Sequence, residues 1–223
     1  MSILYVVATP IGNLGDISGR ALEILKSSDL IFAEDTRVTQ KILNHFEIAV
    51  PIRRYNEHKP EKAFKEAEKL LREGKEIVLV SDSGTPGISD PGGKMVEFVQ
   101  KNLPNTKIRV VPGPSAVVAV LSVSGMPANE FTFLGYPPAK NKRRKFFGRV
   151  AEIKTRPVVL YESPHRVERT LKELAEVLGD DREVFIGREL TKIYEEHFRG
   201  SLEEAIAHFK KGKVKGEFTI IIC

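Results

Sequence analysis

The feature that most constrains the fold is a repeated order of segments in the first half of the chain. A short run of Val, Ile and Leu is followed by a turn rich in Gly and Pro, and then by a segment with helical spacing of apolar residues. The runs expected to form strands are residues 3–7, 30–33, 77–80 and 108–111. Helical patterns over 18–29, with Ser18 as N-cap, and over 61–75, with Gly74 at the C-terminal stop, lie between them. Continuous apolar strands that alternate with helices indicate a parallel sheet covered on both faces.

The second half of the chain has a different pattern. Strand-like segments occur at residues 131–136, 157–162, 183–190, 195–200 and 217–222. They indicate more strands, with fewer helices between them, than in the first half. The sequence therefore predicts a parallel-sheet α/β domain over 1–113 and a mixed-sheet α+β domain over 114–223.

Composition narrows the class of protein. Hydrophobic residues make up 41% and charged residues 29% of the 223, as is typical of a globular protein. The longest apolar run, "AVVAVLSV", is too short to span a bilayer, and the N-terminus reads as a first strand rather than a signal peptide. The one cysteine, Cys223, permits no internal disulfide, which favours a reducing cytoplasm. A net charge of +5 permits a polyanionic partner, and no H-x-x-x-H or C-x-x-C spacing predicts a zinc site.

Three of the Gly/Pro turns indicate a ligand site. Residues 8–13, 81–93 and 112–115 each follow a predicted strand, so all three belong at the carboxyl edge of the sheet, where doubly wound folds bind ligands. Glycines let the backbone approach a ligand closely, and Ser115 is placed to cap a helix. One such loop alone would be an ordinary turn, whereas three on one edge favour a crevice. The chain has neither the P-loop lysine nor the G-x-G-x-x-G fingerprint, which argues against nucleoside triphosphates and NAD.

Several segments, in this order along the chain, resemble one known family. They are "YVVATPIGNLGDIS", "FAEDTRVT", "SDSGTPGISDPG", "VVPGPSAVVAVLSVSG", "FLGYPP", "YESPHR" and "RELTKIYEEHFRG". The chain resembles the ribosomal RNA small-subunit methyltransferase I family, within the tetrapyrrole methylase superfamily. The resemblance implies a two-domain tetrapyrrole-methylase-like (class III) fold, a homodimer in the cytoplasm, and S-adenosylmethionine in the cleft between the domains. It also implies 2′-O-methylation of a cytidine ribose in the decoding region of 16S rRNA.

Two other functions stay open on the sequence alone. One is a superfamily relative that methylates a tetrapyrrole or another small molecule. The other is a non-catalytic RNA-binding assembly factor that has kept the fold. The substrate partner is either small-subunit rRNA or the 30S subunit.

The resemblance also implies the residues that hold the cofactor. In the first domain they belong to the three turns, and a strand of the second domain closes the pocket. They are Pro10, Ile11, Gly12, Ser83, Gly84, Thr85, Ile88, Ser115, Ala116, Tyr161 and Glu162. Thr85 stands where many tetrapyrrole methylases have aspartate, which fits the rRNA branch, and Tyr194 excludes a histidine base at its position.

Methyl transfer to a ribose hydroxyl needs alignment of donor and acceptor and benefits from a proton acceptor, by roughly 10²–10⁴-fold. The candidate acceptors are Glu34, Asp35, Glu162, His165, Glu189 and Lys192. Of these we select Asp35, Glu162 and Lys192. Lys192 can serve only if desolvation lowers its pKa. The alternative is that carboxylates beside arginines, such as Asp35 with Arg37 and Glu162 with Arg166, are structural ion pairs.

The segment "AKNKRRKFFGR", residues 139–149, is the candidate RNA contact. Five of the six residues from Lys140 to Lys145 are basic, and two phenylalanines follow, which suits phosphate binding with aromatic stacking. The alternative is a solvated loop between strands. The expected RNA-binding residues are Arg37, Lys140, Lys142, Arg143, Arg144, Lys145, His165 and Arg166. His58 lies in another loop of the family pattern and is either substrate-facing or a plain surface residue.

Overall fold

The computed structural model describes residues 2–56, 59–210 and 214–223, so His58 lies outside the described residues. The chain divides into two compact units, Met1–Ser115 (unit 1) and Ala116–Cys223 (unit 2). The sequence placed this boundary after residue 113.

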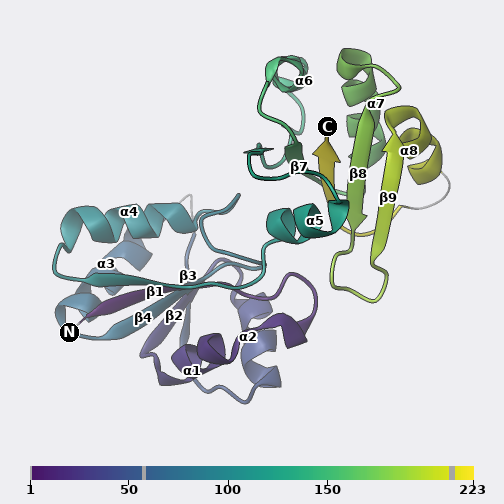
Figure 1. Ribbon diagram of the computed structural model, residues 1–223. Coiled ribbons are helices and arrows are strands. Elements are labelled where there is room, and N and C mark those ends of the chain that lie inside the picture. The colour runs from purple at the N-terminus through teal and green to yellow at the C-terminus, as the bar shows by residue number, and fades with distance from the viewer. Residues whose placement is uncertain (1, 57–58, 211–213) are drawn as a thin grey trace. The chain divides into compact units, whose positions relative to one another are not determined.

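Unit 1 is built on a five-stranded parallel sheet in the order β3-β2-β4-β1-β5 (Figure 1). The strands are β1 (Ile3–Val7), β2 (Leu30–Ala33), β3 (Ile52–Arg54), β4 (Glu76–Val80) and β5 (Lys107–Val111). The four predicted strands are confirmed to within one residue. The edge strand β3 was not predicted, because its two arginines are exposed and give it no apolar run.

Helices cover both faces of this sheet, as predicted. They are α1 (Gly19–Ser27), α2 (Thr36–His45), α3 (Glu61–Arg72) and α4 (Gly92–Asn102), with a short 3-10 helix, η1 (Leu14–Asp16), before α1. Tyr5 of β1 belongs to the core under α1 and α2, whereas its neighbour Leu4 belongs to the core under α3 and α4. This alternation is the two-residue period of a strand buried on both faces. Ser18 caps α1 as predicted, because its Oγ accepts a hydrogen bond of 3.1 Å from the backbone N–H of Ala21.

Unit 2 contains a mixed sheet in the order β6-β7-β10-β8-β9, in which β6 pairs parallel to β7 and the other pairs are antiparallel. The strands are β6 (Thr132–Phe133), β7 (Val158–Glu162), β8 (Glu183–Arg188), β9 (Glu196–Ser201) and β10 (Phe218–Ile222). The helices are α5 (Ala116–Ser124), α6 (Arg143–Glu152), α7 (Val167–Leu178) and α8 (Leu202–Phe209). The last three pack on one face of the sheet around a common apolar core, and α5 contacts β8 and β10 (Figure 1).

The mixed α+β character of the second half is confirmed, but its expected balance of elements is wrong. Within the described residues each unit has five strands and four α-helices. The helix α6 arises from the basic segment, because Phe147 and Val150 share one helix face and enter the core of unit 2. Among the described residues no helix combines the length and apolar content needed to cross a membrane.

Candidate functional site

The three predicted turns meet at the carboxyl edge of the unit 1 sheet. They follow β1, β4 and β5, which are neighbours at the centre and one side of the sheet. The backbone N–H of Thr9 donates to the Gly84 carbonyl at 2.9 Å, and the N–H of Gly84 donates to the Thr9 carbonyl at 3.2 Å. The first two turns are therefore joined by a two-residue antiparallel bridge, which is the arrangement that three separate surface turns would not show.

Side-chain hydroxyl groups hold the turns together. The Thr9 hydroxyl donates to the Ser81 carbonyl at 3.1 Å, and the Ser81 hydroxyl donates to the Gly84 carbonyl at 2.9 Å. The Thr85 hydroxyl donates to the Pro114 carbonyl at 3.2 Å and so ties the second turn to the third. Hydroxyls used in this way fix the backbone and leave other peptide groups of the turns for a ligand. We call residues 9–12, 83–88 and 112–115 together the cradle.

Two glycines make this close approach feasible. Gly84 has φ +80°, and a Cβ at that position would lie 3.3 Å from Cγ2 of Ile11 and 3.5 Å from the Pro114 carbonyl oxygen. A Cβ at Gly113 would lie 3.0 Å from Cβ of Ala8. Side chains at these two positions would push the turns apart, so the sequence keeps the backbone bare where the turns converge.

Asp90 shapes the second turn, although it is not among the residues predicted from the sequence. Its Oδ1 accepts hydrogen bonds of 2.7 Å from the backbone N–H groups of Gly87 and Gly92. A Cβ at Gly92 would meet that same oxygen at 2.9 Å. The available signal was the Asp-Pro-Gly order before α4, since aspartate commonly bonds to backbone amides just after it.

The predicted cofactor residues of unit 1 lie along this edge, and they differ in how far they are exposed to solvent. Gly12, Ser83 and Ile88 are exposed, with Ile88 46% exposed, whereas Pro10, Ile11 and Gly84 are buried and Thr85 and Ser115 are half-buried. The cradle therefore offers peptide groups, one exposed hydroxyl and one exposed aliphatic side chain. Such a surface can bind a ligand that has both polar and apolar parts.

The two predicted cofactor residues of β7 differ from each other. Tyr161 is half-buried, and its ring packs edge-on against Phe133 at a centroid distance of 4.9 Å. Glu162 is 0% exposed, so its side chain is closed to a cofactor, and its expected part in the cofactor pocket stays a prediction for its backbone groups alone.

Glu162 is wrongly predicted as a catalytic base, because unit 2 uses both of its carboxylate oxygens internally. Oε1 accepts from the Ser163 backbone N–H at 2.8 Å and pairs with Arg166 at 2.7 Å. Oε2 accepts from the Thr170 hydroxyl at 2.6 Å. A buried carboxylate with this set of partners is a structural ion pair, the alternative that the sequence left open.

Lys192 does not meet the condition stated for a base. Burial acts to lower the pKa of Lys192, but its hydrogen bonds to Glu189 at 2.7 Å and Glu217 at 2.9 Å outweigh burial and raise that pKa above its usual value. The prediction of Lys192 as a base is therefore wrong. Glu189 is occupied by the same pair, and its carboxylate also accepts from the Glu217 backbone N–H at 2.9 Å.

Asp35 remains at the carboxyl edge of unit 1. It caps α2, because its Oδ1 accepts from the Arg37 backbone N–H at 2.9 Å, and it also pairs with the Arg37 guanidinium. The side-chain hydrogen bond from Arg37 holds the pKa of Asp35 well below its usual range. The backbone N–H of Asp35 donates to Oδ1 of Asp82 at 2.8 Å, which places Asp35 beside the second turn of the cradle.

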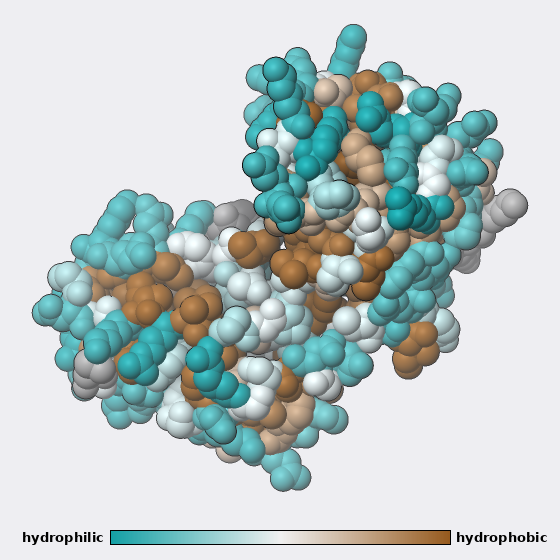
Figure 2. Space-filling model, in the orientation of Figure 1, coloured by the Kyte–Doolittle hydropathy of each residue, from teal (hydrophilic) through white to brown (hydrophobic). Residues whose placement is uncertain are grey.

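The basic segment is part helix and not a plain loop. Lys140, Lys142, Arg144 and Lys145 are exposed, and Figure 2 shows hydrophilic side chains along the visible surface over α6. Arg143 is 3% exposed, and its guanidinium donates to Glu173, to the Thr170 hydroxyl at 2.8 Å and to the Pro138 carbonyl at 2.7 Å. The prediction that Arg143 contacts RNA is therefore wrong.

The other residues expected to contact RNA also differ in whether their side chains are exposed. Phe147 is 1% exposed in the core of unit 2, so it cannot stack on a base as expected. His165 is exposed, as is Arg37, whose side chain is 86% exposed. Arg166 is partly buried through its pair with Glu162 and lies 6.0 Å from the centre of the Tyr136 ring.

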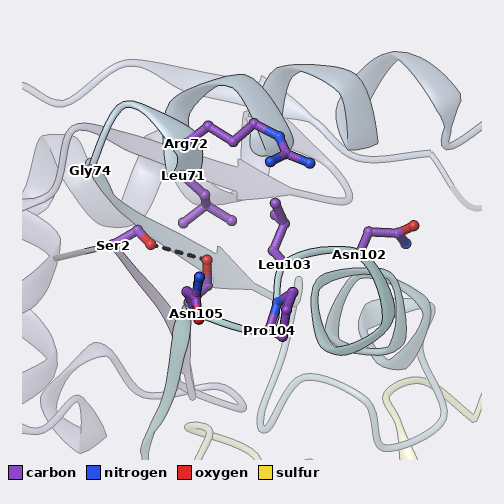
Figure 3. Close-up of a pocket in the computed structure, with 9 residues that line it drawn as sticks. Ser2, Leu71, Arg72, Gly74, Asn102, Leu103, Pro104 and Asn105 are labelled. Carbon is purple, nitrogen blue, oxygen red and sulfur yellow. Dashed lines mark hydrogen bonds between the residues drawn. The ribbon is translucent and has the colours of Figure 1, made fainter.

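A cavity of about 450 Å³ lies at the opposite edge of the unit 1 sheet. Figure 3 shows Ser2, Gly74 and Asn105 around it, before β1, β4 and β5, with Arg72 and Asn102 on the helical side. This is the amino edge of the parallel strands, and Arg72 is already paired with Glu68 at 2.7 Å. Ligands of such sheets bind at the carboxyl edge, so the cradle is the stronger candidate. In the described part of the chain no three His, Cys, Asp or Glu residues gather in a metal-binding group.

Comparison with known proteins gives one consistent result. The sequence profile of the Tetrapyrrole (Corrin/Porphyrin) Methylases matches residues 3–206. A protein of Thermotoga maritima named Ribosomal RNA small subunit methyltransferase I is 45% identical over 100% of this chain and 98% of its own length. The protein of that name from Halalkalibacterium halodurans is 46% identical over 98% of this chain and 75% of its own length.

Solved structures confirm the fold. Uroporphyrin-III-C-methyltransferase from Thermus thermophilus matches 98% of this chain and 93% of its own, with a TM-score of 0.69 at 16% identity. A cobalt precorrin-4 methyltransferase matches 99% and 94% of the two chains, with a TM-score of 0.69 at 17% identity. Another structure of the Thermus thermophilus enzyme is described as complexed with S-adenyl homocysteine.

Proposed function

The chain belongs to the ribosomal RNA small subunit methyltransferase I family of the tetrapyrrole methylases, whose methyl donor is S-adenosylmethionine, and from this we propose its substrate and reaction. The protein is an rRNA methyltransferase that transfers a methyl group to the ribose 2′-hydroxyl of a cytidine in the decoding region of small-subunit rRNA. The proposal includes a homodimer in the cytoplasm, where ribosomal subunits are made.

The meeting of three bare turns at one sheet edge is the observation that carries the proposal. Gly84 and Gly113 let the turns approach one another closely, and the hydroxyls of Thr9, Ser81 and Thr85 fix their shape. The cradle fits a donor with an amino-acid end, a ribose and a base, because it offers both peptide groups and the exposed Ile88. S-adenosylmethionine supplies the electrophilic methyl group when bound.

The protein contributes mainly alignment, since displacement at a sulfonium methyl is an in-line reaction. The cradle residues hold the donor end, and exposed cations of the basic segment hold RNA phosphates. The hydroxyl proton leaves as the new C–O bond forms, and we assign Asp35 as its acceptor. Asp35 is ionised at neutral pH, as an aspartate of ordinary pKa is, and the hydrogen bond from Arg37 lowers its pKa further, so it is a weak base.

Two measurements test the function in turn. Calorimetry without RNA should detect binding of S-adenosylmethionine, which a non-catalytic assembly factor does not need. Tritium transfer from labelled donor should then modify unmethylated small subunits or their rRNA but not a tetrapyrrole, and mapping should locate one 2′-O-methylated cytidine. Transfer to a tetrapyrrole alone, or to a base rather than a ribose, would contradict the proposal.

A further inference from the structure

Unit 1 has a second, open cavity that the proposed reaction leaves unused. Its volume is about 500 Å³, and it lies along α2 beside the edge strand β3. The lining consists of two cations, three neutral hydrogen-bonding side chains and one aliphatic side chain, without a carboxylate. These residues are Thr36, Arg37, Gln40, Lys41, Asn44 and Ile52.

The cations of this groove retain capacity to bind an anion. Asp35 takes up Nε and Nη2 of Arg37, and no hydrogen bond joins Nη1 to any described residue. Lys41 is exposed and forms no ion pair with the residues that the structure describes. A paired but 86% exposed guanidinium can still bind a phosphate oxygen, since Arg presents five N–H donors.

The adjacent edge strand adds positive charge to the same area. Arg53 and Arg54 of β3 are both exposed, and Arg54 lies close enough to Asp35 to help lower the pKa of its carboxyl group. Arg53 is neutralised by Glu66 at 2.9 Å, so Arg54 is the arginine of β3 that adds net positive charge beside the groove. Asp35 and Asp82 oppose the charge of Arg37, and the hydrogen bond between them lies at the end of the groove beside the cradle.

The groove begins beside the cradle, at the carboxyl edge of the same sheet, and runs along α2 toward the start of β3. The Asp35 backbone N–H donates to Oδ1 of Asp82 at 2.8 Å, and Asp82 immediately precedes the second turn of the cradle. A polymer whose reacting group reaches the cradle must therefore continue past this region or leave the surface. The alternation of cations with neutral amides and a hydroxyl suits a sugar–phosphate chain, which presents phosphates and 2′-hydroxyls in turn.

We infer that the α2–β3 groove binds the sugar–phosphate backbone of the substrate RNA next to the methylated nucleotide. This rests on the proposed function, because it takes RNA as the substrate. Lys41 and Arg37 neutralise phosphates, while Gln40, Asn44 and Thr36 bind sugar hydroxyls or further phosphate oxygens. The contact is independent of base identity, so it positions the RNA without selecting its sequence.

The test uses Lys41 in the full-length protein, with an unmodified small-subunit rRNA transcript as the probe. We expect Lys41→Ala to weaken RNA binding about fivefold to tenfold at 0.1 M salt and to lower the salt slope by about 0.7 to 0.9. Lys41→Arg should restore both values, because it keeps the charge. Lys62→Ala, which removes an exposed lysine from α3 on the other sheet face, is the matched control and should leave both unchanged.

The outcomes separate this inference from the proposed function. If Lys41→Ala binds and methylates RNA as the unaltered protein does, the groove is not an RNA site and the proposed function stands. If Lys62→Ala loses as much affinity as Lys41→Ala, the effect is general charge and the groove is again excluded. If the unaltered protein binds S-adenosylmethionine but neither binds nor methylates the RNA, the proposed function fails and the inference fails with it. An unchanged donor affinity in Lys41→Ala shows that the cradle is intact.

Discussion

The cradle of unit 1 and the charged cluster of unit 2 show two opposite ways to use polar groups. In the cradle, backbone groups and small hydroxyls shape an open edge, and Gly84 and Gly113 let the turns pack closely together. In unit 2, Arg143, Thr170 and Glu162 form a continuous chain of hydrogen bonds that is almost fully buried. Arg143 and Glu162, two charged residues expected from the sequence to act on RNA or in catalysis, are scaffold, whereas glycines and small hydroxyl residues form the candidate cofactor site.

This comparison has a physical basis in desolvation. A buried charge is tolerated only when partners satisfy it, and removing one partner leaves the other uncompensated. The unit 2 cluster is therefore closed to ligands. Peptide groups at an open edge form hydrogen bonds with water and therefore carry little desolvation cost. A ligand can replace the water bound to them.

The largest expected effect is on the stability of unit 2. Arg143→Ala should lower the free energy of unfolding by about 3–5 kcal/mol, because it leaves the Glu173 carboxylate and Thr170 without their buried donor. Urea unfolding followed by circular dichroism measures this. Arg144→Ala is the matched control, since that neighbouring arginine is exposed, and it should change stability by less than about 0.5 kcal/mol. Equal losses of stability in the two variants would contradict the assignment of Arg143 as a buried structural residue.

The next effect separates the two candidate proton acceptors. Asp35→Asn keeps the α2 cap but removes the base, so kcat should fall about 100-fold. Lys192→Arg should stay within about threefold of the unaltered enzyme, because Lys192 is a charged partner of Glu189 and Glu217 rather than a base.

The pH dependence follows from the directions of the two pKa shifts. Because the pKa of Asp35 is lowered in the folded protein, its contribution to the free energy of unfolding is present above about pH 3.9. That contribution is lost as the pH falls through the pKa of the folded state. Because the pKa of Lys192 is raised in the folded protein, its contribution to the free energy of unfolding is present below about pH 10.4. That contribution is lost as the pH rises through the pKa of the folded state. Neither group should add a limb to the kcat profile between about pH 6 and 9. A limb that disappears in Lys192→Arg would contradict the assignment.

A fourth prediction concerns the exposed part of the basic segment. The triple variant Lys142→Ala, Arg144→Ala, Lys145→Ala should weaken RNA binding by some tens of fold at 0.1 M salt and reduce the salt slope by about 2. Its affinity for S-adenosylmethionine should not change. Filter binding across a salt series gives both values, and an unchanged slope would exclude the segment as an RNA contact.

The smallest effect compares two glycines that have nearly the same positive φ. Gly84→Ala and Gly74→Ala both place a Cβ at a positive φ, +80° and +82°, so both should cost about 1–2 kcal/mol of stability. Only Gly84→Ala should weaken donor binding, by about tenfold, because its Cβ meets Ile11, whereas nothing lies within 4 Å of a Cβ at Gly74. Calorimetric titration of both variants measures this. Equal donor affinities would show that the Gly84 turn is not part of the site.

Sequence reasoning recovered the sheet of unit 1 because its strands are unbroken apolar runs that end in turns. It missed α2, in which only Val38, Ile42 and Leu43 of ten residues are apolar, and β3, which is three residues long. It also located the three turns on one edge, because strand direction alone fixes which ends of parallel strands lie together.

The sequence could not separate the cations of the basic segment without the helix. Arg143, Phe147 and Val150 have the i, i+4, i+7 spacing of one helix face, and the last two enter the core. That spacing was the available signal that Arg143 points inward. The pairing of Glu162 with Thr170 depends on contact between β7 and α7, which no local pattern specifies.

The central claim is that the three turns bind the methyl donor together, and hydrogen–deuterium exchange tests it most directly. With S-adenosylhomocysteine added, amide exchange should slow in peptides covering residues 9–12, 83–88 and 112–116 at the same ligand concentration. Protection confined to the amino edge of the sheet around Ser2, Gly74 and Asn105, or protection of one turn without the other two, would contradict it.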